Sequence, residues 1–342
     1  MTGGSSVTEA NESGAAPNTV GPRAPKPWQK ALPWLIALAC FGYLYTKVAG
    51  ASAREGTSIA GYLVAAFAGV SWGRWLALMV PYSCFFFLID TLVVWAVLRW
   101  FNDRGLRYLD ILPIRGSSYI LSIINEQVGK GAMVLYLNRR HSVRGWEVGS
   151  SMLFIMFCEF YYLLMWATLG YALRRDALPP EFAVIPGIAI AAALALAAFL
   201  LFFSGRLSVA SSFRARPIFK AFREARLWHY AAVVVMRSPA LLSAVVVYTF
   251  ALRLFGVEVG FGEMLGYLPV IFFGAATPGP MRTVAISLWV ALFPGNEGSM
   301  LAFGFVQHNF FIFFNAAIGL IFLRRANREL FGRTAAAASP TA

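Results

Sequence analysis

The sequence predicts an all-α polytopic membrane protein, and three observations lead to this prediction. Hydrophobic residues make up 59% of the 342 residues, charged residues make up only 13%, and the mean hydropathy is +0.65. Apolar segments follow one another over 31–325, which predicts a single transmembrane domain. Two of these segments, near 116–138 and 265–293, are interrupted in the middle by polar residues, glycine or proline. We therefore expect about six full transmembrane helices and two re-entrant or broken helical segments in an inverted repeat.

The full helices are expected where long apolar stretches have no internal break. They lie near 31–46, 75–100, 146–173, 184–203, 230–255 and 300–323. At the ends of the chain, 1–30 reads as a disordered cytoplasmic tail and 326–342 as a second cytoplasmic tail. The amphipathic stretch 59–75 suits either a helix along the membrane interface or a short helix packed on the bundle.

The net charge of +13 comes from basic residues that cluster between the apolar segments. The connector 205–229 is the clearest case, because its six basic residues are accompanied by Glu224 alone. The positive-inside rule then places this connector and both termini in the cytoplasm, and the protein in the cell membrane. Specific binding of lipid headgroups by the connector is an alternative. We expect membrane lipids, anionic ones above all, and no nucleic acid as partners, while the sequence identifies no protein partner.

The segment 265–293 is broken at its centre by Pro278, Gly279 and Pro280. Each proline removes a backbone donor, so a regular helix cannot continue through this stretch. Two half-helices that meet inside the membrane are the favoured interpretation, with Thr277 and Arg282 at their tip. The alternative is a single kinked helix whose Arg282 reaches back to the interface.

The segment 116–138 is interrupted by Asn125–Gln127 and by the run Gly129, Lys130 and Gly131. Basic residues on both sides indicate that it enters and leaves the membrane on one face. The three consecutive polar residues favour a cavity-lining role over simple hydrogen bonding between helices.

The two broken segments are expected to enter from opposite faces, the first from the cytoplasm and the second from outside. Inverted repeats of this kind carry a binding site near the membrane midplane. The N-termini of half-helices attract phosphate or carboxylate groups, and Lys130 and Arg282 strengthen this preference. The candidate substrate-binding residues are Asn125, Glu126, Lys130, Glu159, Thr277 and Arg282.

Several polar residues fall inside the expected full helices. Asp90 and Glu159 must face the bundle interior, either in a functional role or in a structural pair with Arg237 or Lys130. We expect Arg237, near the start of its helix, to extend to the cytoplasmic interface. The run Gln307–Asn309 should make hydrogen bonds between helices.

The order of the polar motifs is similar to that of a known family. An Asn-containing segment with Gly-x-Gly at Asn125–Arg140, Glu159 within a span, and the break Thr277-Pro278-Gly279 resemble the lysylphosphatidylglycerol synthase membrane region. Stand-alone members of this family are flippase-like integral membrane proteins. The resemblance covers 31–325 and implies lipid binding and translocation. It does not imply lipid synthesis, because we expect no soluble aminoacyl-transferase domain in this chain.

No catalytic or metal-binding motif is recognisable. The three cysteines and three histidines are scattered without ligand spacing, so no metal or cofactor is expected. The sequence thus favours a flippase-like protein that is not an enzyme. An integral-membrane transferase acting on a lipid and a non-catalytic membrane scaffold are the alternatives.

Overall fold

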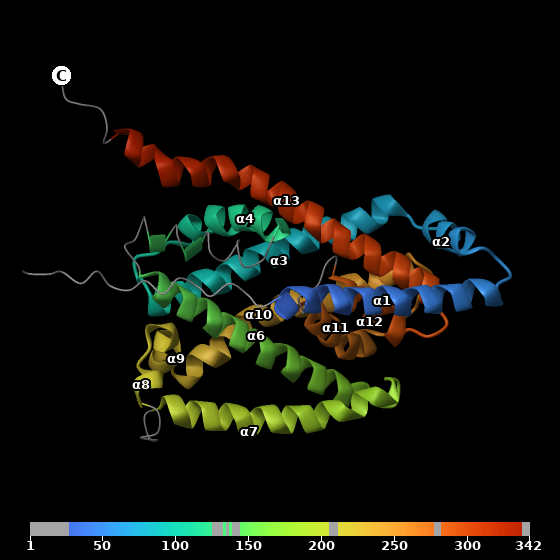
Figure 1. Cartoon of the computed structure of the whole chain (residues 1–342), viewed down its shortest axis with the longest axis horizontal. Coiled ribbons are helices and arrows are strands. Elements are labelled where there is room, and N and C mark those ends of the chain that lie inside the picture. Colours follow the sequence, from blue (N-terminus) through green and yellow to red (C-terminus); the bar gives the residue numbers. More distant parts are fainter. Residues whose placement is uncertain are drawn as a thin grey trace, which may run out of the picture.

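A computed structural model describes residues 27–124, 133–134, 137–138, 144–204, 211–276 and 282–336, with side chains from Trp34 to Leu323 except at 121–124. All regular structure in these ranges is helical, which confirms the predicted fold class (Figure 1). Six of the helices are long and apolar enough to cross a membrane, so the chain is a multi-pass membrane protein.

Each of the six expected stretches corresponds to a membrane-crossing helix, and the one near 230–255 ends two residues earlier, at Arg253. These helices are α1 (Pro27–Arg54), α3 (Trp72–Phe101), α6 (Gly145–Arg174), α7 (Ile185–Phe203, preceded by the 3₁₀ turn η1, Pro180–Val184), α10 (Leu227–Arg253) and α13 (Glu297–Ala336). The shorter helices are α2 (Ile59–Ala68), α4 (Tyr108–Ile124), α8 (Ser211–Arg214), η2 (Pro217–Phe219), α9 (Lys220–Glu224), α11 (Phe261–Ala276) and α12 (Thr283–Leu292).

Two helices extend well beyond the expected spans. Helix α1 continues to Arg54, past the expected end at 46. Helix α13 continues to Ala336, well past the expected span end at Leu323. The residues after that point are rich in Arg, Ala, Glu and Leu, which favour helix, so part of the expected tail is helical. In the stretch 59–75, α2 is a separate short helix packed on the bundle, because the Tyr62 hydroxyl accepts a hydrogen bond of 3.0 Å from Gly298 N–H of α13.

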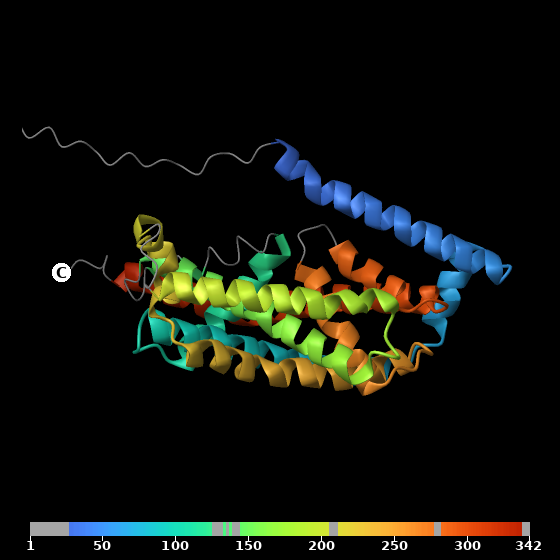
Figure 2. The ribbon, with the colours of Figure 1, turned by 90° about the horizontal axis from the view of Figure 1, so that it is seen from below.

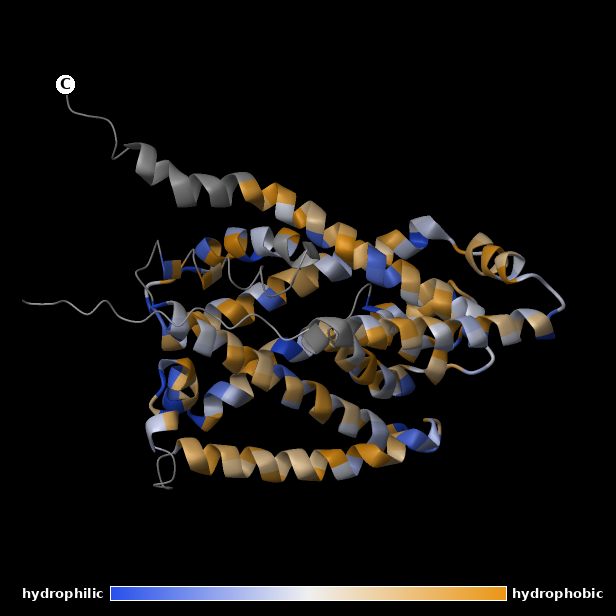
Figure 3. Ribbon diagram, viewed as in Figure 1, coloured by the Kyte–Doolittle hydropathy of each residue, from blue (hydrophilic) through white to orange (hydrophobic). Residues whose placement is uncertain are grey.

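The bundle has two ends with different charge, which we call the basic end and the opposite end. At the basic end α3 finishes and α6 begins, and the short helices η2 and α9 pack on α6. Hydrophilic residues gather at this end around α8 and α9 (Figure 3). At the opposite end α1 and α10 finish and α13 begins (Figure 1). Helix α7 is apolar on all sides and largely exposed, as expected of a lipid-facing helix. Figure 2 shows α1 diverging from the bundle toward its N-terminus.

The buried hydrophobic residues form one large core at each end. The basic-end core includes Val93 and Val97 of α3, Ile111 of α4, and Val233 of α10. The opposite-end core includes residues from the other halves of α3, α6 and α10, and from α11, α12 and the start of α13. The change from one core to the other falls near the middle of the long helices.

Helices α11 and α12 form an antiparallel hairpin that starts and ends at the opposite end. The rings of Tyr267 and Phe293 are 4.8 Å apart near its base, and Gly274 faces Leu288 nearer its tip. Helices of 16 and 10 residues reach only about 24 and 15 Å, less than the ~30 Å of a bilayer core. The segment 265–293 is therefore two half-helices, and the alternative of one kinked helix was wrong. The tip residues Thr277, Pro278, Gly279 and Pro280 lie outside the described residues.

Helix α4 is the described beginning of the other broken segment, and it enters from the basic end. It runs antiparallel to α13, with Gly116 against Phe322 and Ile120 against Gly319. Met133 and Leu137 are buried in the same basic-end core as the first turn of α4, so the chain has returned to that end. The intervening Asn125, Glu126, Gly129, Lys130 and Gly131 lie outside the described residues. Two re-entrant elements thus enter from opposite ends, and α13 packs against both.

Candidate functional site

Four charged side chains from four helices meet where the two cores join. They are Asp90 of α3, Arg115 of α4, Glu159 of α6 and Arg237 of α10, and we call them the central charge cluster. Arg237 contacts both carboxylates, with Nη1 3.1 Å from Glu159 Oε1 and Nη2 3.4 Å from Asp90 Oδ1. Arg115 Nε lies 2.6 Å from Asp90 Oδ2. Formal charges of two carboxylates and two guanidinium groups cancel.

Neutral groups complete the cluster. The Tyr119 hydroxyl donates a hydrogen bond of 2.8 Å to Asp90 Oδ2, so each oxygen of this carboxylate has a partner. One turn after Glu159 on α6, the Tyr162 hydroxyl donates to the backbone carbonyl of Arg237 at 3.3 Å. This helical spacing places the glutamate and the tyrosine on the face of α6 that meets α10.

Burial divides the cluster into a closed part and an open part. The side chains of Asp90 and Arg237 are only 5% and 8% exposed, whereas that of Glu159 is 43% exposed. Removing an ion from water costs several kcal/mol unless it is paired, and here the pairing is present. Glu159 is therefore the more accessible of the two acids.

The structure corrects one expectation and adds one residue. Arg237 does not extend to the interface, because its ion pairs with the buried Asp90 and the half-exposed Glu159 hold it inside the bundle. Arg115 lies one residue before the expected segment 116–138, and helix α4 already begins at Tyr108, so its spacing of four residues from Tyr119 places both on one helical face. That spacing was the signal that the sequence offered.

Arg282 lies at the tip of the hairpin, at the N-cap of α12. Its φ of 50° is the single positive value among the non-glycine residues that the structure describes. Gly304 of α13 lies against Ile286 of α12, and in this antiparallel pair His308, one turn on, lies opposite Arg282.

The tip is surrounded by buried polar groups that lack partners. Thr283 and His308 are 1% and 2% exposed, yet neither the threonine hydroxyl nor either ring nitrogen of the histidine has a hydrogen-bond partner. Gln307 donates from Nε2 to the Tyr248 hydroxyl oxygen at 2.5 Å, but its Oε1 has no partner. We call Arg282, Thr283, Gln307 and His308 the tip cradle.

Aromatic pairs join the helices of the central charge cluster to residues next to the tip cradle. Phe160, next to Glu159, packs on Phe273 near the tip of α11 with ring centroids 5.5 Å apart. On α3, Tyr82 lies two turns from Asp90 and packs on Tyr248 at 5.8 Å. Of the six candidate residues from the sequence, the structure describes Glu159, in the central charge cluster, and Arg282, in the tip cradle, and the other four lie outside its described ranges.

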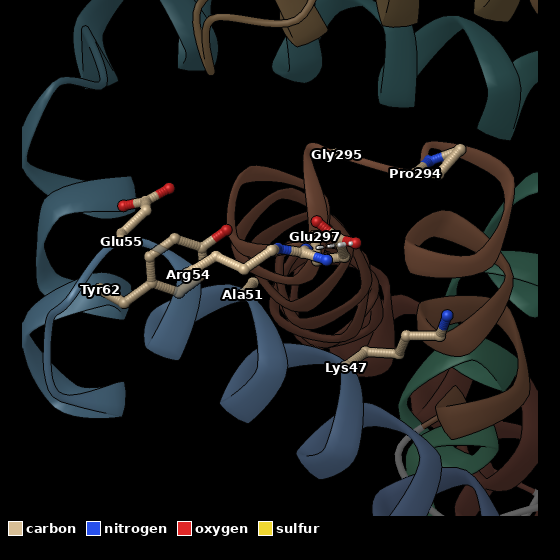
Figure 4. A pocket seen from close by; sticks show the side chains of 8 residues that line it. All are labelled: Lys47, Ala51, Arg54, Glu55, Tyr62, Pro294, Gly295 and Glu297. Carbon is tan, nitrogen blue, oxygen red and sulfur yellow. Dashed lines mark hydrogen bonds and ion pairs between the residues drawn. The ribbon is translucent and has the colours of Figure 1, made fainter.

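A cavity of about 350 Å³ opens at the opposite end, between the ends of α1 and α2 and the loop before α13 (Figure 4). Arg54 reaches across it to Glu297, with Nη2 and Oε1 3.1 Å apart. The arginine is 66% exposed, and such surface pairs contribute little energy. We interpret this cavity as a gap in the packing where α1, α2 and the start of α13 meet.

Within the described ranges, no three His, Cys, Asp or Glu side chains gather closely enough to hold a metal ion. Comparison with known proteins adds no identity: no family model matches the chain, and no curated protein or solved structure matches it.

Proposed function

We propose that this protein binds an anionic lipid or lipid-linked substrate between its two re-entrant elements and helps it move between leaflets, as a flippase-like protein does. The observation that supports this proposal is the half-exposed Glu159, held at mid-bundle by Arg237 between elements that enter from opposite ends. An ionisable side chain at this depth marks a substrate pathway by default.

The chemistry of the interior suits a lipid headgroup. Arg282 and the N-terminus of α12 provide positive charge for an anionic group. Glu159 provides an acceptor for hydroxyl or ammonium groups of the same headgroup. The apolar exterior of α1 and α7 keeps the acyl chains of the membrane in contact with the bundle.

We place the basic end in the cytoplasm of the cell membrane, as the positive-inside rule requires. Helix α1 ends at the opposite end and α13 begins there, so both chain termini then belong to the cytoplasmic side. The re-entrant α4 opens from the cytoplasm and the α11–α12 hairpin from outside.

A leaflet-exchange assay tests the function. Purified protein is reconstituted in phosphatidylcholine vesicles that contain fluorescent phosphatidylglycerol, and quenching from outside reports exchange. We expect the wild type to accelerate exchange and E159Q to reduce the rate about tenfold, because a charge-assisted contact is lost. The control E263Q alters an acid of α11 that pairs with Arg174 at the opposite end, and it should leave exchange unchanged.

Thermal unfolding verifies that E159Q stays folded. Exchange no faster than in protein-free vesicles, for anionic and lipid-linked probes alike, would refute transport and favour a scaffold. Equal rates for the wild type and E159Q would refute the role of the central charge cluster.

A further inference from the structure

We infer that the tip cradle binds the phosphate group of the substrate, with Thr283 and His308 as its hydrogen-bond donors. This inference rests on the proposed function and names the chemical group that the site recognises.

The first argument is the helix start. Helix α12 has ten residues, and no side chain caps its first N–H groups. The N-terminus of a helix carries about half a positive charge and free donors, and it lies inside the bundle, where water does not screen it. Phosphate is a common ligand of such helix starts.

The second argument is independent of the helix and comes from the buried polar atoms. A buried hydroxyl or imidazole without a partner costs about 1–3 kcal/mol, so native proteins rarely leave one. Here Thr283 Oγ1 and both nitrogens of His308 are in this state beside the same helix start. A ligand that accepts hydrogen bonds satisfies the hydroxyl and the ring N–H together.

The third argument concerns the sign of the ligand charge. The cradle brings together a guanidinium, a hydroxyl, an imidazole and backbone N–H groups, which can all donate, and one unpartnered acceptor, Gln307 Oε1. Two described acids belong to other sites: Glu159 pairs with Arg237 in the central charge cluster, and Glu297 pairs with Arg54 at the opposite end. Because the donors outnumber the single acceptor, an anion with several acceptor oxygens fits the cradle better than a cation does.

The test compares two lipids with the same acyl chains. Protein in a maltoside detergent, which carries no phosphate, is titrated with dioleoyl phosphatidylglycerol or with dioleoylglycerol, and bound lipid is counted by native mass spectrometry. The variants are T283V, which keeps the shape of the side chain, and T283V/H308L. The control is S287A, which removes a buried unpartnered hydroxyl one turn further along α12.

We expect the wild type and S287A to prefer phosphatidylglycerol, and T283V to bind it about tenfold more weakly with dioleoylglycerol binding unchanged. A second titration uses inorganic phosphate in the same detergent. Binding of inorganic phosphate that T283V weakens would support the cradle with free phosphate as its source. Its absence, alongside the lipid result, would support a lipid phosphate.

Two outcomes would overturn the inference in distinguishable ways. If the wild type and both variants bind phosphatidylglycerol equally, the tip cradle is not the phosphate site, while the proposed function stands. If the wild type shows no preference for phosphatidylglycerol over dioleoylglycerol and no affinity for inorganic phosphate, the inference fails, and the leaflet-exchange assay then decides the function separately.

Discussion

The central charge cluster and the tip cradle are both polar sites in an apolar bundle, but their groups are paired to different degrees. In the cluster, every charge has an opposite partner and Tyr119 donates a further hydrogen bond to Asp90, although Arg237 Nε makes no hydrogen bond. In the cradle, Thr283 and His308 are more deeply buried, and their side-chain polar atoms have no partners among the atoms of the protein. Paired charges hold helices together by themselves, whereas unpartnered polar groups gain stability from a ligand.

The two sites should consequently respond in opposite ways to removal of a polar group. Loss of a partner in the central charge cluster leaves a buried charge or acceptor unsatisfied. Loss of a polar group in the cradle removes a group that was already unsatisfied. Three substitutions, measured by unfolding in detergent without added lipid, test this contrast.

The largest effect is expected for R237Q. It leaves the buried Asp90 and the half-buried Glu159 without their shared cation, and breaking a buried pair costs about 3–5 kcal/mol. The control R253Q changes an exposed arginine in the last turn of the same helix and should alter the free energy of unfolding by less than about 0.5 kcal/mol. A loss below about 1 kcal/mol in R237Q would show that other groups neutralise the two acids.

A smaller loss is expected for Y119F, which removes one hydrogen bond to a charged acceptor. Such bonds contribute about 1.5–3 kcal/mol, so the free energy of unfolding should fall by that amount. In Y108F the lost bond is exposed and ends on the backbone carbonyl of Leu88, so the decrease should be smaller. Equal losses in both variants would contradict the special role of Asp90.

The smallest effect, with the opposite sign, is expected for T283V. Removing an unpartnered buried hydroxyl should raise the free energy of unfolding by about 1 kcal/mol. The same substitution at Thr91, whose buried hydroxyl donates to Phe87 O at 2.7 Å, should lower it by about 1 kcal/mol. If both variants are destabilised alike, Thr283 has a partner in the protein and the contrast between the sites disappears.

Much of the architecture could be predicted from sequence, because apolar length and proline position act locally. The six spans, and the division of the segment 265–293 into α11 and α12, follow from these two properties. Depth in the membrane also predicted that Asp90 and Glu159 face inward; Asp90 is buried, and Glu159 pairs with the buried Arg237 while its side chain stays 43% exposed. Local sequence patterns were sufficient to predict those features that depend only on the lipid environment of the chain.

The pairing of polar residues could not be predicted, because it depends on which helices meet. Arg237 was expected at the interface since it lies near the expected start of its span, but attraction to two acids on other helices outweighs that position. The run Gln307–Asn309 shows the same limit. Gln307 bonds to another helix, Asn309 donates to Phe305 O of its own helix, and His308 bonds to neither.

The position of α13 has a consequence for the biogenesis of this chain. Its Gly304 packs against α12 and its Gly319 packs against α4, so this one helix provides a packing surface for both re-entrant elements. Helix α13 follows every other described helix in the sequence, so both elements leave the ribosome before the helix against which they pack has been synthesised. Neither element can reach its final packing during synthesis until α13 has been inserted.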